Sequence, residues 1–105
     1  MSRHFLDCEY RVTLGYDRPL DQFFLQVARL PSDPAQDEES PFVYASIDDP
    51  NDRCNLEYYW AKLRELGITV PATMFLEVSN DAFNRVGNRY VQHFADGRFV
   101  EPVPN

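Results

Sequence analysis

The chain has 105 residues, of which 44% are hydrophobic and 14% aromatic, and its net charge is −7. This length suits one domain spanning 1–105, and this composition excludes collagen-like and wholly disordered chains. No apolar run approaches the roughly 18 residues that span a bilayer. Because nucleic acids and cytoplasmic membrane surfaces are themselves negatively charged, an acidic chain is not expected to bind either of them. The two cysteines, Cys8 and Cys54, lack the spacing of a metal site. We therefore expect a cytoplasmic domain.

Alternating polar and apolar residues predict a first strand over 5–14, followed by turn residues at 15–19. The apolar face of this strand consists of Leu6, Cys8, Tyr10, Val12 and Leu14. Aromatic and β-branched residues over 22–30 predict a second strand, antiparallel to the first. A third, short strand is predicted over 42–47. Cys8 is expected to be buried in this sheet.

Two acidic segments flank the third predicted strand. Residues 31–41 contain four acids, three prolines and no base, a composition that predicts a flexible loop. Asp48, Asp49 and Asp52 form the second segment. These seven acids account for the whole net charge of −7, so the rest of the chain is neutral. We expect both segments to be solvated loops that favour solubility.

Apolar residues at helical spacing predict a helix over 54–66, with Asp52 or Asn55 capping its start. Its apolar stripe consists of Leu56, Tyr59, Trp60, Leu63 and Leu66. Because Trp60 and Leu63 lie at the centre of that stripe, we expect both to be buried against the sheet.

A second helix is predicted over 71–85, with Pro71 in its first turn. Its apolar face consists of Ala72, Phe75, Leu76, Phe83 and Val86, widened by Met74 and Val78. A helix that is apolar over so much of its circumference is expected to be largely buried or to contact a partner.

The chain ends in a predicted hairpin, 89–95 and 98–101, joined by an Asp-Gly turn. A two-residue turn pairs His93 with Val100, and the last strand is expected to be a short edge. The resulting element order is β-β-β-α-α-β-β. It predicts an α+β domain in which an antiparallel sheet of about five strands carries both helices on one face.

The clustered carboxylates Asp48, Asp49 and Asp52 are one candidate binding site, because hard cations prefer oxygen ligands. The spacing of an EF-hand is absent, since its final glutamate would fall on Tyr59 or Trp60. A solvated loop that caps a helix explains the same residues. No metal and no cofactor is therefore predicted.

Arg89, Tyr90 and His93, near the final hairpin, are the other candidates for binding a partner or a ligand. A nearby carboxylate could adjust His93 for acid–base chemistry. However, no nucleophile stands at a motif-defined distance from it, and His4 is expected to be exposed. No catalytic residue is therefore predicted, and the chain is interpreted as more like a binding protein than an enzyme.

The leading interpretation is a small interaction or accessory domain whose partner is another protein or a second copy of this chain. One alternative is a small enzyme or ligand-binding domain with a pocket between the sheet and the helices. Another is an acidic inhibitor that docks on a basic partner. An enzyme would show a concave pocket with convergent titratable groups, whereas a binding module would show an exposed surface suited to a partner.

Overall fold

A computed structural model of the protein describes residues 1–29, 42–51 and 55–101. Six strands, two α-helices and one 3-10 helix (η2) make up this part of the chain. In chain order they are β1 Ser2–Asp7, β2 Tyr10–Asp17, β3 Gln22–Arg29, β4 Phe42–Ala45, η2 Ser46–Asp48, α1 Leu56–Glu65, α2 Ala72–Phe83, β5 Arg89–His93 and β6 Phe99–Val100. The loop predicted over 31–41 and the candidate Asp52 lie outside the described residues.

The six strands form one mixed sheet in the order β4-β3-β2-β1-β5-β6. Strand β1 is parallel to β5, and the other neighbours are antiparallel. The predicted α+β class is confirmed, but the predicted all-antiparallel sheet of about five strands is wrong. The strands between β1 and β5, together with both helices, form a long crossover, the connection that parallel neighbours require.

The missing strand arises because the segment predicted as one strand over 5–14 is a hairpin. The chain reverses where the Cys8 N–H donates to the Tyr10 carbonyl oxygen over 2.9 Å. Leu6 and Val12 are paired across this hairpin and both are buried, so the alternation continues in phase through the turn. The expectation that Cys8 is buried is wrong, because Cys8 lies in the turn and is exposed.

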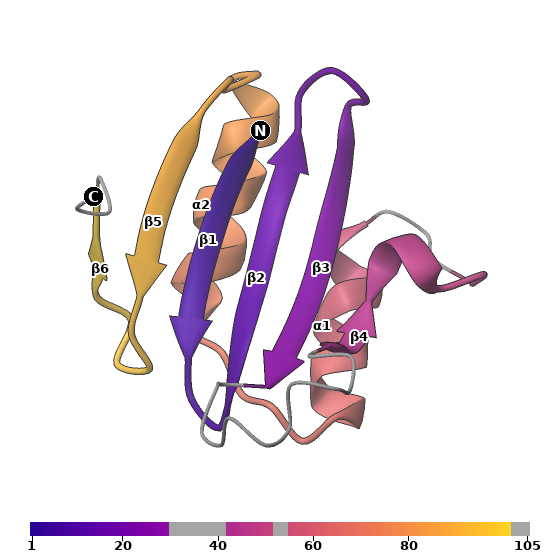
Figure 1. The fold of residues 1–105 in the computed structure, drawn as a ribbon. Coiled ribbons are helices and arrows are strands. Elements are labelled where there is room, and N and C mark those ends of the chain that lie inside the picture. The colour runs from indigo at the N-terminus through magenta and orange to yellow at the C-terminus, as the bar shows by residue number, and fades with distance from the viewer. Residues whose placement is uncertain (30–41, 52–54, 102–105) are drawn as a thin grey trace.

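Both helices pack on the same face of the sheet, behind it in Figure 1, and no described element covers the other face. Leu63 of α1 is buried in the core between the layers, as expected. Trp60, also expected to be buried, is instead 36% exposed and packs edge-on against the Phe75 ring. Tyr59 takes the buried position, where its hydroxyl donates to the Phe23 carbonyl oxygen over 3.1 Å. The predicted stripe therefore does face the sheet, with Tyr59 and Leu63 at its centre and Trp60 at its edge.

The buried face of helix α2 agrees only in part with the face predicted over 71–85. Leu76 and Phe83, expected inside, are 60% and 88% exposed. Met74, Phe75 and Val78 are buried, as expected, and the polar Asp81 is buried beside them. Because Leu76 and Phe83 are apolar but exposed, the pattern of apolar residues alone did not identify the buried face of the helix.

The final hairpin also differs from its prediction by one residue. His93 pairs with Phe99 rather than with Val100, because the turn contains three residues instead of two. Gly97 occupies the left-handed region at φ 93°, and its N–H donates to the Phe94 carbonyl oxygen over 3.0 Å. This geometry is the three-residue hairpin turn with a glycine in its last position. As a result, the Phe99 ring lies 5.3 Å from the His93 ring, measured between centroids.

Asn55, one of the two predicted caps, begins α1 by accepting a hydrogen bond from the Tyr58 N–H over 2.7 Å. Replacing Asn55 with Ala should lower the free energy of unfolding by about 1 kcal/mol, because the first turn loses this acceptor. Chemical denaturation measures the change. The exposed Asn80 of α2, replaced with Ala, serves as the matched control and should change stability little. An equal loss in both variants would contradict the capping role.

Candidate functional site

Asp48 and Asp49, the two described members of the acidic segment that follows β4, have different surroundings. Asp48 is exposed at the end of η2, while Asp49 accepts hydrogen bonds from the Tyr44 and Tyr58 hydroxyls over 2.7 and 2.8 Å. The Tyr44 hydroxyl, the Asn51 N–H and the Tyr58 hydroxyl lower the pKa of the Asp49 carboxyl. Asp49 thus ties β4 to α1. Within 1–29, 42–51 and 55–101, no group of three or more potential metal-ligating side chains could hold a metal ion.

His93, a candidate from the sequence, belongs to a buried network that links β1, β5 and α2. His4 was expected to be exposed, but it is fully buried, with Nδ1 2.8 Å from His93 Nε2. The other ring nitrogen, His4 Nε2, lies 2.6 Å from Asp81 Oδ2. The expectation for His4 is wrong because β1 begins at Ser2, which places His4 in phase with the buried Leu6.

Arg89, another candidate, extends this network to the surface. Its guanidinium donates to Asp81 Oδ1 over 2.7 Å and to Glu77 Oε1 over 2.8 Å, and it also binds Glu101. The Glu101 carboxylate most strongly raises the pKa of Arg89, with Glu77 and Asp81 adding to it. Arg89 thereby joins β5 to α2 and to the residue that follows β6.

The electrostatics of the network fix its charge state. Burial opposes ionisation of Asp81, but hydrogen bonds from His4, Arg89 and Ser2 outweigh it and lower the pKa of this carboxyl. Burial and the neighbouring His4 imidazole lower the pKa of His93 to about 4. The network at neutral pH is therefore an ionised carboxylate, an ionised guanidinium and an uncharged His93.

One atom of the network has no partner. His4 Nε2 is hydrogen-bonded to Asp81, and the His4 Nδ1 and His93 Nε2 nitrogens share a second hydrogen bond, whose direction depends on the tautomers of the two rings. His93 Nδ1, the remaining ring nitrogen, is buried and has no described group within hydrogen-bond distance. His4, Asp81 and His93 are each exposed by 1% or less, so a substrate cannot reach them. Because these side chains are buried between β1, β5 and α2, their role in this structure is to link the three elements.

Two members of this network, His4 and Asp81, were not among the predicted site residues. A signal for each was present in the sequence. His4 continues the alternation of Leu6 toward the N-terminus. Asp81 lies three residues after Val78 and seven after Met74, which places it on the buried face of α2.

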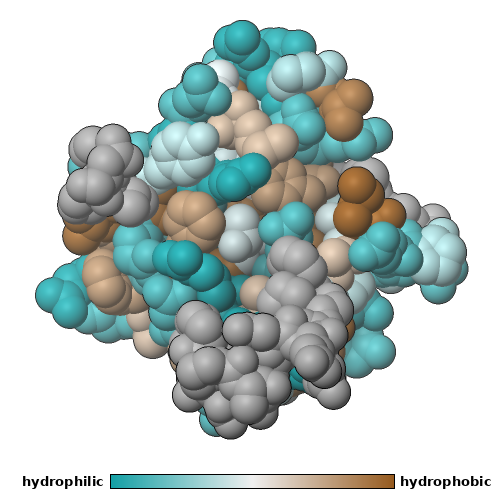
Figure 2. All heavy atoms as spheres, viewed as in Figure 1, coloured by the Kyte–Doolittle hydropathy of each residue, from teal (hydrophilic) through white to brown (hydrophobic). Residues whose placement is uncertain are grey.

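Tyr90, the remaining candidate, lies on the opposite side of β5 from His93 and does not contribute to the network. It is paired with Arg3 and is 45% exposed on the sheet face that the helices leave uncovered, called here the open face. The other members of the open face, taken from the strand register, are Arg3, Phe5, Asp7, Arg11, Thr13, Asp17, Gln22, Phe24, Gln26 and Gln92. Figure 2 shows polar and apolar residues interleaved across it.

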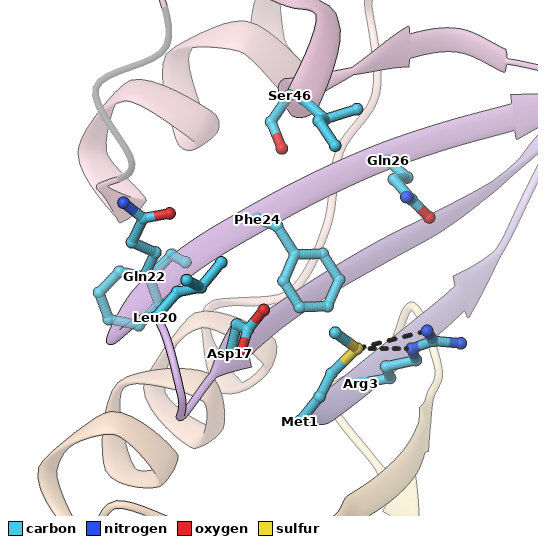
Figure 3. A pocket seen from close by; sticks show the side chains of 10 residues that line it. Met1, Arg3, Asp17, Leu20, Gln22, Phe24, Gln26 and Ser46 are labelled. Atoms are coloured by element: carbon cyan, nitrogen blue, oxygen red, sulfur yellow. Dashed lines mark hydrogen bonds between the residues drawn. The ribbon is translucent and has the colours of Figure 1, made fainter.

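A groove of about 260 Å³ indents the open face beside β2 and β3. The residues that line it include Arg3, Asp17, Leu20, Gln22, Phe24 and Ile47. Phe24 lies near the middle of this group in Figure 3. Its ring occupies the space above Gly15, where any Cβ would collide with the ring and with the Ser2 carbonyl oxygen. The absence of a side chain at Gly15 therefore allows the Phe24 ring to lie against the backbone of β2.

A second hollow, of about 340 Å³, lies on the helix side of the molecule between α1 and the segment before α2. Its lining includes Trp60, Leu63, Ile68 and Val70, with Arg64 as its one charged residue. It contains no pair of convergent titratable groups and so lacks the chemistry of an active site.

Comparisons with protein-family models, with curated proteins and with solved structures found no match to this chain. None of the described helices is long and apolar enough to cross a membrane. What the protein does must therefore be inferred from its own geometry.

Proposed function

We propose that this chain is a cytoplasmic, non-catalytic interaction domain that binds a protein partner through the open face. The observation that supports the proposal is a sheet face that carries aromatic and charged side chains and that no described element covers. The histidines that could serve acid–base chemistry are instead sealed in the core. Aromatic and charged side chains on an uncovered surface, with the histidines buried, favour a binding function over a catalytic one.

The composition of the open face resembles that of protein interfaces. Aromatic residues and arginine are enriched at such interfaces. Here the Arg11 guanidinium lies over the Phe5 ring of β1, 4.8 Å from its centroid, and Tyr90 lies on the neighbouring strand β5. The two arginines of the face are balanced by Asp7 and Asp17, so it has no positive excess for nucleic acid. A protein partner, including a second copy of this chain, is therefore favoured.

The two alternatives have less support. The titratable groups between the sheet and the helices are inaccessible, which argues against an enzyme that uses a pocket there. An acidic inhibitor would depend on the two acidic segments, and five of their seven acids lie outside the described residues. Neither alternative has a described surface comparable with the open face.

Paired variants on the two sides of the molecule test the proposal. Phe5→Ala and Tyr90→Ala remove aromatic rings from the open face, while Leu76→Ala and Phe83→Ala remove exposed apolar side chains from the helix side. Each variant, expressed in its native cells, is cross-linked, and the proteins attached to it are quantified. Sedimentation of the purified chain measures self-association, and circular dichroism verifies that each variant is folded.

We expect the open-face variants to lose cross-linking or self-association by about tenfold or more, while the helix-side variants keep it. Loss only in the helix-side variants would contradict the proposal. So would a monomeric chain that cross-links to the same extent in every variant.

A further inference from the structure

We infer that the groove around Phe24 binds a small zwitterion with an apolar side chain, of the chemical class of the free α-amino acids. This inference goes beyond the proposed binding of a protein partner and does not depend on it. It is drawn from the charges, the size and the apolar walls of the groove.

Two side chains that line the groove, Arg3 and Asp17, carry opposite charges, and no described residue forms an ion pair with either of them. Among the described residues, the Arg3 guanidinium donates only to the sulfur of Met1, over 3.3 and 3.4 Å, and no carboxylate lies within ion-pair distance of it. Sulfur is a weak acceptor, so this cation keeps its capacity for a carboxylate. Asp17 is half-buried and makes no ion pair or side-chain hydrogen bond with any described residue.

These two groups are diagonal neighbours on adjacent strands. Arg3 is paired with Gly15, and Asp17 lies two residues further along β2 on the same face. A pure anion would be attracted by Arg3 and repelled by Asp17, and a pure cation would meet the reverse. A ligand with both a carboxylate and an ammonium group satisfies both. The side-chain charges of the groove, which sum to zero, therefore match a zwitterion.

The dimensions of the groove favour a small molecule. Its volume of about 260 Å³ lies just below the range of roughly 300–1,000 Å³ that is typical of sites for drug-sized ligands. A nucleotide would also bring more negative charge than Arg3 alone could match.

The remaining walls supply an apolar surface for the ligand's side chain. The Phe24 ring forms the floor, and Leu20 and Ile47, which are 65% and 87% exposed, stand beside it. Figure 3 shows Leu20, Asp17 and Arg3 arranged around the Phe24 ring. An aromatic or branched aliphatic side chain could stack on this ring while its charged groups reach Arg3 and Asp17.

Calorimetric or NMR titration of the purified full chain tests the inference. The probes are L-phenylalanine, its amide, which lacks the carboxylate, and N-acetyl-L-phenylalanine, which lacks the ammonium group. For a ligand of this size on an open groove we expect a Kd of about 0.1–1 mM for the free amino acid. Each blocked compound should bind about tenfold more weakly.

Charge-removing variants show whether the binding occurs in this groove. Arg3→Gln should abolish the preference for L-phenylalanine over its amide, and Asp17→Asn should abolish the preference over the N-acetyl compound. Arg11→Gln and Asp7→Asn are the matched controls, since this ion pair of 3.0 Å lies on the same face but does not line the groove. Both controls should bind like the wild type.

Equal affinity for the free and blocked compounds would overturn the inference, because the groove would then recognise only apolar surface. Absence of binding at about 10 mM, tenfold above the expected Kd, would overturn it as well. A dipeptide that binds where the free amino acid does not would also contradict it, since the two charges would then lie too far apart for one amino acid. None of these results depends on whether a protein partner binds the open face.

Discussion

Replacing Asp81 with Ala should lower the free energy of unfolding by about 3–5 kcal/mol, because it removes one partner from a buried ionic network. The Asp81 carboxylate is 1% exposed and accepts hydrogen bonds from His4 and from Arg89. Without it, the buried His4 Nε2–H has no acceptor and Arg89 loses one of its three carboxylates. Each donor that loses its acceptor stays removed from water without a compensating hydrogen bond, and this destabilises the folded state.

Urea denaturation of the variant measures this effect. Ser79→Ala, at an exposed position on the same helix, is the matched control and should change stability little. If Asp81→Ala is too unstable to purify, Asp81→Asn retains the shape of the side chain, removes its charge and replaces one of its two acceptor oxygens with an NH2 donor. A loss below about 1 kcal/mol in Asp81→Ala would show that the network contributes no more than an ordinary surface contact.

A variant with apolar residues in place of the network tests why Asp81→Ala lowers the free energy of unfolding. In the triple variant His4→Leu, Asp81→Leu, His93→Phe, the two imidazoles and the carboxylate are absent together. Removing all partners of a buried polar network at once is often much less costly than removing one. We therefore expect the triple variant to be more stable than Asp81→Ala alone, although Arg89 and Ser2 still lose a contact.

The local elements were predictable because each depends on residues that are close in sequence. The helix predicted over 54–66 is α1, and its cap at Asn55 follows from the residue type and its position. Which side of the helix faces the sheet was less predictable, because Tyr59 and Trp60 are both large and apolar. Only the sheet, whose Phe23 carbonyl receives the Tyr59 hydroxyl, decides between them.

Long-range arrangement was not predictable from periodicity. Nothing in the alternation of 5–14 marks the turn at Cys8, because even-numbered residues stay on one face before and after it. The parallel pairing of β1 with β5 joins Ser2 to Arg89, and it is this pairing that brings His4 beside His93. The buried network therefore depends on topology, and a single sequence contains no direct signal for it.

The candidate groove was hidden for a related reason. Gly15 reads as a turn residue in the sequence, and it was predicted within the turn 15–19. In the fold it lies within β2, where its missing side chain makes room for the Phe24 ring. A glycine inside a strand pattern is the one signal that could have indicated a close approach at this position.

The stability of the protein should fall as the pH is lowered from 6.5 to 4. Burial and the neighbouring His4 imidazole lower the pKa of His93 from 6.5 to about 4, so the unfolded chain binds a proton in this range that the folded chain excludes. Because the unfolded state then holds more protons, acid favours unfolding. The contribution of His93 is complete above pH 6.5, and its loss by pH 4 amounts to about 3 kcal/mol.

The charges around His93 act in both directions. His4 and Arg89 oppose its protonation, and Glu77 and Asp81 favour it, but burial is the largest influence. The pKa of Asp81 is lowered, so its own contribution is present above its ordinary pKa of 3.8 and is lost only as the pH falls further. The effects of His93 and of this carboxylate are therefore separated in pH.

Urea denaturation at a series of pH values between 4 and 7 measures the dependence, and His93→Phe is the diagnostic variant. Phenylalanine fills the site beside the Phe99 ring but cannot be protonated, so the stability of this variant should change less across the range. The comparison uses the slope with pH, since the substitution also alters packing. If both proteins lose stability equally between pH 6.5 and 4, then His93 is protonated as readily in the folded chain as in the unfolded one. In that case its burial next to His4 does not control the acid sensitivity of the fold.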